Sequence, residues 1–105
     1  MYKIVYYVPL SHLEVTKQAL FNAGAGCYGQ YDQVCWQAEG QGQFRPLAGS
    51  QPFIGQTNQV ETVLEYRVEL LCHMDKLAAA VEALVKAHPY EQPAYEAWRL
   101  SYPKG

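Results

Sequence analysis

The chain has 105 residues, of which 50% are hydrophobic and 17% are charged. This length is enough for one domain with a single core and too short for two, and the composition excludes a disordered chain. Eight basic and ten acidic side chains give a net charge of −2. The basic surface that nucleic acids and anionic membranes select is therefore missing, and we expect neither as a partner.

Two further features of the sequence indicate the cellular compartment of the protein. The first apolar stretch, residues 4–10, is too short to span a membrane and lacks the features of a secretory signal. Cys27, Cys35 and Cys72 are an odd number of cysteines without CxxC spacing, which argues against a disulfide framework and a zinc knuckle. We expect a cytoplasmic protein with reduced thiols.

The first elements predicted along the chain are a strand and a helix. Residues 2–8 are rich in tyrosine, valine and isoleucine, and Pro9 ends this strand by removing a backbone donor. Ser11 and Glu14 have the spacing of a capping box, which predicts that a helix starts there. The helix has one apolar side, which we expect to face a sheet, and Gly24 ends it.

A second strand and a long loop follow. Residues 27–38 favour a pleated surface, and the glycines of 40–42 are expected to break this strand. The loop around 40–58 is rich in proline and glycine. Long ordered loops in small domains tend to be functional, so this loop is a candidate site.

The second half of the chain repeats the strand and helix pattern. Residues 61–72 alternate cleanly between apolar and polar side chains, residues 74–87 form an amphipathic helix, and residues 94–100 form a closing strand. Two such units with right-handed crossovers predict an α+β fold, the ferredoxin-like βαββαβ plait, with an antiparallel sheet and both helices on one face. We expect it to be a single domain over residues 1–105.

One face of such a sheet has no helices to cover it. We expect that face to carry some of the aromatic residues Tyr7, Tyr31, Trp36 and Tyr95. Aromatic side chains on an open sheet face usually mark a partner surface, so the sequence predicts a homo-oligomer.

The hexapeptide from His88 to Pro93 is the most unusual motif of the chain. Its two prolines stiffen a short connection that displays the imidazole of His88, the phenol of Tyr90 and the carboxylate of Glu91. The favoured interpretation is structural: His88 caps the preceding helix and binds carbonyls there, while Tyr90 packs on the sheet. The alternative is a ligand or metal site.

Arg45, which follows Phe44 in the long loop, is the only Lys or Arg between Lys17 and Arg67. An isolated arginine in such a loop can bind an anionic ligand bidentately. The alternative is an arginine paired with Glu39.

A metal site would need several ligands. Glu61, Glu65 and Glu69 recur with strand spacing on one face, where a cation would relieve their repulsion. His88 and Glu91 alone are too few ligands, so a divalent metal would also need residues such as Glu65 or side chains from a neighbouring subunit. The alternative is a solvated polar face with cross-strand partners.

Taken together, several segments resemble the inserted domain of the NGG-interacting-factor (Nif-three, YqfO) family, in the right order and over nearly the whole chain. They are Gly24-Ala25-Gly26, Gly29-Gln30-Tyr31-Asp32, Gly40-Gln41-Gly42-Gln43-Phe44-Arg45-Pro46, Pro52-Phe53-Ile54-Gly55 and His88-Pro89-Tyr90-Glu91-Gln92-Pro93-Ala94-Tyr95. The resemblance implies a stand-alone relative of a PII- and CutA-like domain, a ferredoxin-like plait that associates through its sheet, commonly as a trimer.

The resemblance also limits what can be transferred. It implies that, in full-length members of the family, this domain is inserted into a larger α/β domain that carries a two-metal site. Some of these members are described as GTP cyclohydrolases. These 105 residues offer no positions that match those metal ligands, so we expect no transfer of that activity. Gln92 stands where the family usually has an acidic residue, which weakens a carboxylate-pair interpretation of the turn.

We therefore expect a non-enzymatic regulatory or small-ligand-binding module that self-associates as a dimer or trimer. Its expected ligand-binding residues are Phe44, Arg45, His88, Tyr90 and Glu91. Arg45 would hold a small anionic ligand. The alternative is a divalent-metal-binding protein, or a fragment related to metal-dependent hydrolases, whose site is completed between subunits by His88, Glu91 and Glu65.

Overall fold

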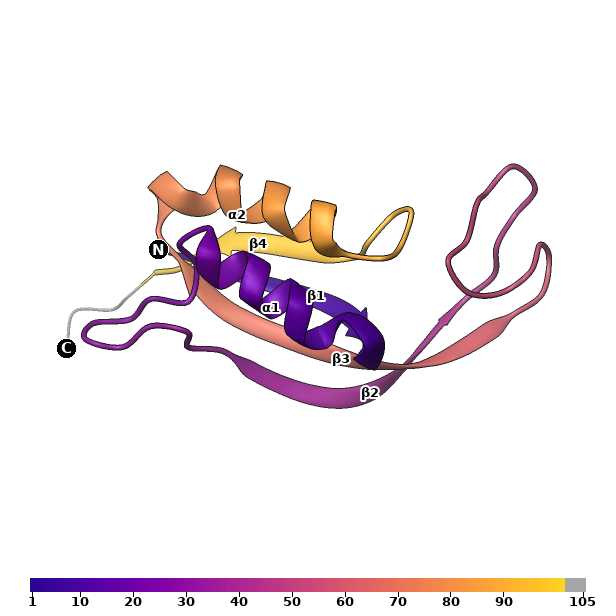
Figure 1. The fold of residues 1–105 in the computed structure, drawn as a ribbon, viewed down its shortest axis with the longest axis horizontal. Helices are drawn as coiled ribbons and strands as arrows, with labels where there is room; N and C mark the ends of the chain where they lie inside the picture. Colours follow the sequence, from indigo (N-terminus) through magenta and orange to yellow (C-terminus); the bar gives the residue numbers. More distant parts are fainter. Residues whose placement is uncertain (102–105) are drawn as a thin grey trace.

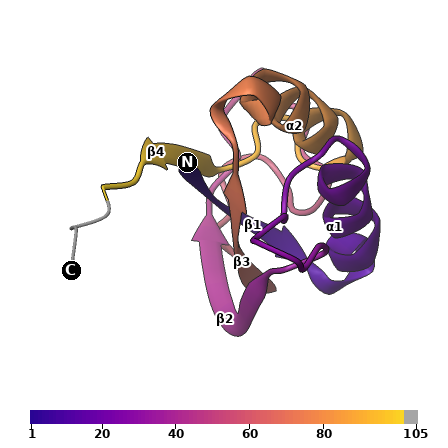
Figure 2. The same cartoon turned by 90° about the vertical axis from the view of Figure 1, so that its left-hand side faces the viewer.

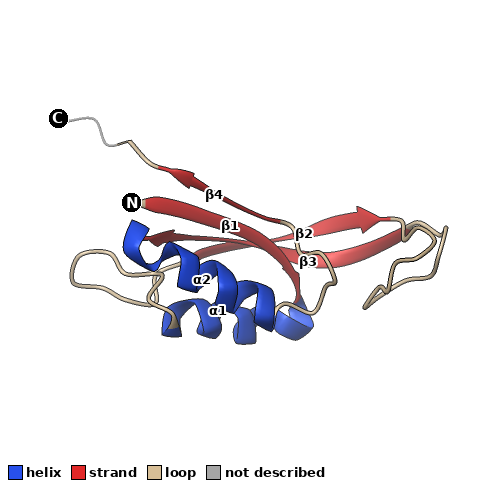
Figure 3. Ribbon diagram, turned by 90° about the horizontal axis from the view of Figure 1, so that it is seen from above, coloured by secondary structure: helices blue, strands red, loops and turns tan. Residues whose placement is uncertain are grey.

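The computed structural model describes residues 1–101 and shows a sheet covered on one face by two helices (Figures 1 and 2). The elements are β1 (Tyr2–Pro9), the short 3₁₀ helix η1 (Leu10–His12), α1 (Leu13–Asn22), β2 (Trp36–Phe44), β3 (Glu61–Cys72), α2 (Met74–Ala87) and β4 (Tyr95–Arg99). The four strands are antiparallel and lie in the order β2-β3-β1-β4. Figure 3 shows both helices on the same side of the sheet. This arrangement confirms the predicted βαββαβ plait.

The core lies between the sheet and the two helices. Ile4 and Tyr6 of β1 stand opposite Leu70 and Val68 of β3, and all four side chains are buried in one cluster. The Tyr6 phenol lies 2.9 Å from the hydroxyl of Thr16 on α1, which itself donates to backbone carbonyls of its own helix. Since a hydroxyl has one proton, Tyr6 donates to Thr16, and the buried polar pair joins sheet to helix without an unsatisfied group.

The start of α1 differs from the predicted capping box. Residues Leu10–His12 form a 3₁₀ turn, so Ser11 lies inside that turn and the N-cap of α1 is His12, which makes no side-chain capping bond. The hydroxyl of Ser11 instead bonds Nδ1 of His12 at 2.8 Å. The prediction was wrong because the 3₁₀ turn moves the N-cap of α1 to His12, so the Ser11 hydroxyl does not stand at the start of the α-helix.

The second strand is also displaced from its predicted range of 27–38. Residues before Trp36 form a tight turn, closed by a bridge between Tyr28 and Tyr31, and Gly29 has a φ of 58° there. The strand then continues through the glycines that were expected to break it, with Gly42 paired to Val63. Glycine keeps its backbone donor and acceptor, so the ladder survives without a side chain.

The hairpin formed by β2 and β3 extends beyond the rest of the sheet. β1 pairs with β3 only from Glu65 to Cys72, so residues 61–64 pair with β2 alone. This two-stranded ribbon carries the loop of residues 45–60 away from the helices (Figure 1). The loop is closed at its base by a 2.6 Å hydrogen bond from the amide of Asn58 to the carbonyl of Pro46.

The helix-free face carries some of the predicted aromatic residues. Tyr7 and Trp36 stand opposite Arg67 and Glu69, on the side away from the core. Tyr95 was expected there as a further member of this set, but it pairs with the core residue Tyr6 and so lies on the helix side. Tyr31 lies in the turn before β2 and belongs to neither face.

A tryptophan that was not predicted completes this face. Trp98 of β4 stands opposite Lys3, and its side chain is 40% exposed, while Trp36 is 58% exposed.

Among residues 1–101, no helix has the length and apolar character needed to cross a membrane.

Candidate functional site

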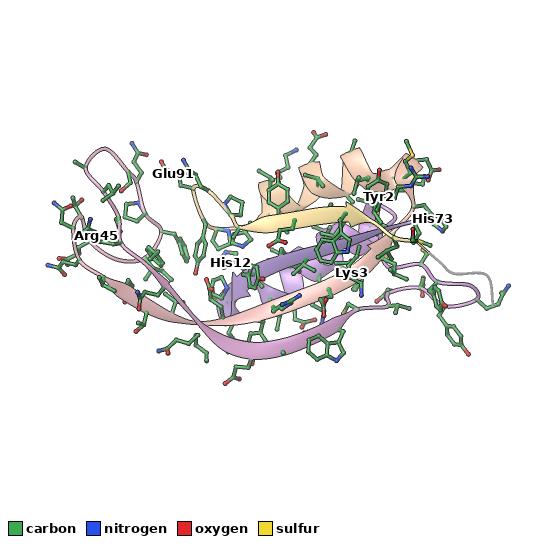
Figure 4. The ribbon with its side chains drawn as sticks, turned by 180° about the vertical axis from the view of Figure 1, so that it is seen from behind. Tyr2, Lys3, His12, Arg45, His73 and Glu91 are labelled. Carbon is green, nitrogen blue, oxygen red and sulfur yellow. The ribbon has the colours of Figure 1, made fainter. Side chains whose placement is uncertain are left out.

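A cavity of about 540 Å³ lies at the end of the sheet from which the β2–β3 hairpin projects. Its walls come from the helix-free face of the strands, from the loop of residues 45–60, and from the turn of residues 88–94 that joins α2 to β4. We call it the hairpin cavity. Figure 4 shows Arg45 and Glu91 at this end of the molecule, with Tyr2 and His73 at the opposite end.

The hairpin cavity gathers most of the residues that the sequence pointed to. Phe44 and Arg45 from the end of the hairpin, Glu65 from β3, and Tyr90 and Glu91 from the turn all line it. These positions are far apart in the sequence and are brought together by strand pairing and by the folding back of the loop. His88 does not line the cavity.

His88 lies behind the cavity wall and is only 6% exposed. Its Nε2 lies 2.6 Å from the carbonyl oxygen of Tyr7, and its Nδ1 accepts a 3.2 Å hydrogen bond from the amide of Tyr90. A carbonyl can only accept, so Nε2 carries the proton, and Nδ1 is unprotonated because it accepts. Both nitrogens of a neutral imidazole are thus occupied, and neither is free to bind a ligand or a metal.

The pKa of His88 is lowered from its ordinary value mainly by burial, which disfavours the charged ring. The bond to the Tyr7 carbonyl and the charge of Glu65 oppose this effect, while His12 adds to it. His88 thus binds a backbone carbonyl, as the structural interpretation predicted. The carbonyl belongs to Tyr7 of β1, however, and not to the end of α2.

Tyr90 forms the centre of the cavity wall. Its ring centroid lies 6.1 Å from that of Phe44 and 6.4 Å from that of Phe53, and its hydroxyl donates a 2.8 Å hydrogen bond to Oε2 of Glu65. Burial, together with this hydrogen bond and the charge of Glu65, raises the pKa of Tyr90 far above its usual value. Tyr90 is therefore a neutral donor that connects the turn to β3.

Besides the contact of Phe53 with Tyr90, two contacts hold the loop of residues 45–60 against the rest of the molecule. Glu91 Oε1 accepts a 3.2 Å hydrogen bond from the amide of Gln51. Phe53 packs edge-on against the ring of His12, with centroids 5.5 Å apart. Sequence reasoning did not select Phe53 or Tyr7 as site residues, although Phe53 lies within one of the motifs that carried the family resemblance.

Arg45 is exposed at the rim of the cavity. Within residues 1–101 it has no acidic partner within salt-bridge distance. Glu39, the partner considered from the sequence, instead accepts a 3.0 Å hydrogen bond from the hydroxyl of Tyr66. The guanidinium of Arg45 thus keeps its donors for solvent or a ligand.

The structure also shows what the residues proposed for a metal do within one chain. Over residues 1–101, no group of three or more His, Cys, Asp and Glu side chains is placed to hold a metal ion. Glu69 pairs with Arg67 at 3.4 Å, while Glu65 and Glu91 reach the hairpin cavity. A metal there would need further ligands from another chain.

The chain is similar to a part of several longer proteins. No protein-family model matches the chain. Two proteins named GTP cyclohydrolase 1 type 2 homolog, from Mycobacterium leprae and Bacillus subtilis, are each 42% identical to it, over 103 and 94 residues. These matches cover 98% and 90% of this chain but 27% and 25% of the relatives. The chain thus spans about a quarter of the length of the curated relatives that it matches.

Solved structures agree with this result. A Bacillus cereus protein related to NIF3 matches with a TM-score of 0.82 and 36% identity, over 96% of this chain and 26% of that one. The divalent cation tolerance protein CutA from Archaeoglobus fulgidus matches with a TM-score of 0.69 and 16% identity, over 99% of this chain and 88% of that one. At that identity, the CutA likeness shows the fold alone.

Proposed function

Because the chain is homologous to the inserted domain of the NIF3-type GTP cyclohydrolase 1 type 2 homologs and has a CutA-like fold, we propose that it is a non-enzymatic, self-associating module that binds a small ligand in the hairpin cavity. The relatives that carry this name are about four times as long as this chain. We propose that this chain acts in the cytoplasm, where its three free thiols stay reduced.

The observation that carries the proposal is the convergence of three distant segments on one cavity. Its volume of about 540 Å³ lies in the range of small-molecule sites, which are mostly apolar with a few placed polar groups. Phe44 and Tyr90 form the apolar walls, Glu91 orients the ligand, and the unpaired Arg45 holds an anionic group at the rim. His88 contributes indirectly, because it fixes the backbone of Tyr90.

The assembly part of the proposal is supported by the helix-free face. Trp36 and Trp98 lie at opposite edges of the sheet and are 58% and 40% exposed. Large apolar side chains of this kind are typically covered by a partner. We propose that a second or third copy of the chain covers them.

A second candidate function is divalent-metal binding between subunits. The observation that favours it is that Glu65 and Glu91 line the same cavity, since carboxylate oxygens are common metal ligands. Elemental analysis of protein purified without chelators decides this point. Stoichiometric metal that disappears in Glu65→Gln supports this candidate, and metal-free protein removes it.

Thermal shift measurements test the proposed function. The full chain is screened against nucleotides, small organic acids and amino compounds, each alone, because a ligand that binds only the folded state raises the melting temperature. A compound present at 100 times its Kd adds about 2.7 kcal/mol, which corresponds to a shift of several degrees for a domain of this size.

The test compares two variants that each remove one positive charge. Arg45→Ala is expected to lose most of the shift produced by an anionic ligand. Arg67→Ala is the control, because Arg67 pairs with Glu69 and does not line the cavity. A flat response to every compound, or equal losses in both variants, contradicts the proposed site.

A further inference from the structure

We infer that the ligand of the hairpin cavity carries a cationic N–H group, such as a primary ammonium on an aromatic body, and that the carboxylate of Glu65 accepts it. This inference rests on the proposed function, because it specifies the chemistry of the same cavity. It assigns to Glu65 the role of the recognition group inside the cavity and leaves Arg45 at the exposed rim.

The carboxylate of Glu65 has unused acceptor positions. Among residues 1–101, its carboxylate has one hydrogen-bond donor, the hydroxyl of Tyr90, and no Lys or Arg lies within salt-bridge distance. The nearest candidate along the strand, Arg67, is paired with Glu69. An ionised carboxylate offers about four acceptor positions, and placing it in a half-buried site is costly unless a cation pairs with it.

This carboxylate lies close to Gly42 of β2. A Cβ atom added to Gly42 would lie 2.6 Å from Cδ of Glu65 and would overlap one of its oxygens. The carboxylate thus lies directly against the bare backbone of β2, in the position that any other residue at 42 would occupy. Because Gly42 and Glu65 both line the cavity, this close approach places the carboxylate in the cavity wall.

Aromatic rings form other parts of the cavity wall. Tyr7, Phe44 and Tyr90 line the same cavity, and the faces of aromatic rings are electron-rich and attract cations. Glu91 adds a second carboxylate, which is exposed and accepts from the amide of Gln51. The half-buried carboxylate of Glu65 thus lies in a wall with aromatic rings, which favours an organic cation over an anion at that point of the cavity. An anionic group on the same ligand would extend outward to the exposed Arg45.

The test uses three probes that share one aromatic ring: phenethylamine carries only the ammonium, 3-phenylpropionate carries only the carboxylate, and phenylalanine carries both. The ¹⁵N-labelled full chain is titrated with each, and the amide signals of Gly42 and Tyr90 report on the cavity. We expect phenethylamine and phenylalanine to shift these signals at millimolar concentration and 3-phenylpropionate to leave them in place.

Isosteric variants assign the effect to one carboxylate. Glu65→Gln keeps the shape and an acceptor for Tyr90 but loses the charge, so it is expected to weaken phenethylamine binding about tenfold or more. Glu61→Gln lies on the same face of β3 but outside the cavity lining, and it is expected to bind like the wild type.

Each other result overturns the inference. Binding of 3-phenylpropionate alone would do so while leaving a ligand-binding cavity in place. Equal losses in Glu65→Gln and Glu61→Gln would show a general charge effect and not recognition by Glu65. If none of the three probes shifts the amide signals, the inference fails, and the thermal shift screen then decides separately whether the proposed function stands.

Discussion

Three side chains connect the turn after α2 to the sheet through a continuous series of hydrogen bonds. His88 binds the carbonyl of Tyr7 and accepts from the amide of Tyr90, whose hydroxyl in turn donates to Glu65. Each bond fixes the next group in the series, so the cavity wall formed by Tyr90 is held from both ends. At the residue scale, the site therefore depends on a neutral imidazole and on an unobstructed carboxylate.

Gly42→Ala is expected to remove this carboxylate from its position. The new methyl group would overlap Glu65, and displacing the carboxylate breaks its bond to Tyr90, at an expected cost of about 1–3 kcal/mol. Urea unfolding measures the loss of stability. Gly40→Ala is the control, since Gly40 lies on the same strand and face with nothing within 4 Å of an added Cβ. Equal destabilisation by both variants would contradict the described geometry.

The pH dependence of stability is expected to report on His88. Its pKa in the folded chain is lowered from the ordinary value of 6.5, so the unfolded chain binds more protons between the two pKa values. This stabilising contribution is present above pH 6.5 and is lost as the pH falls towards the folded-state pKa. Protonation would also place a proton on Nδ1, opposite the amide of Tyr90.

The measurement is the urea midpoint as a function of pH for the wild type and His88→Gln. The downward slope below pH 6.5 is expected to flatten in His88→Gln and to persist in His73→Gln, because His73 is exposed. A slope that is unchanged in His88→Gln would mean that another group causes it.

At the scale of elements, the β2–β3 hairpin places the loop over the cavity. β3 and α2 have the bounds that the sequence predicted, because alternation over residues 61–72 and the proline after His88 are strong signals. β2 was misplaced because its signals conflict. Aromatic residues lie before it in a turn, and glycines lie within it, where Gly42 makes room for the side chain of a neighbouring strand.

Phe53→Ala is expected to release the loop while leaving the sheet intact. Phe53 contacts the rings of His12 and Tyr90, and an aromatic pair contributes about 0.5–1.5 kcal/mol beyond its buried area. Amide hydrogen exchange should therefore become faster at Gln51 and Asn58 and stay unchanged in β1. Val60→Ala, a change at an exposed position outside the cavity lining, is expected to alter neither. Unchanged exchange in Phe53→Ala would show that other contacts hold the loop.

At the scale of the whole molecule, two helices cover one face of a four-stranded sheet and leave the other face open. The sequence predicted this architecture, and it predicted that the loop and the turn would carry the candidate site residues. It could not predict that the cavity would join them, because the pairing that places Glu65 near Gly42 and Tyr90 is a property of the folded sheet. Nor could it tell which of the four aromatic residues lie on the open face, because a one-residue change of register moves a side chain to the other face.

Replacing both exposed tryptophans is expected to weaken self-association. The double variant Trp36→Gln and Trp98→Gln removes large apolar surface from the helix-free face, so the average mass in light scattering at micromolar concentration should fall towards that of one chain. Val15→Gln is the control, since Val15 is exposed on α1, on the covered side of the sheet. An oligomer that survives in the double variant would place the contact elsewhere.

Native mass spectrometry of the full chain, purified without added ligand or chelator, tests most directly whether the protein is a self-associating module with an occupied hairpin cavity. We expect a mass of two or three chains with a small molecule bound to each, and the small molecule should be lost in Phe44→Ala. A spectrum that shows only single, unliganded chains under the same conditions would contradict both halves of the account.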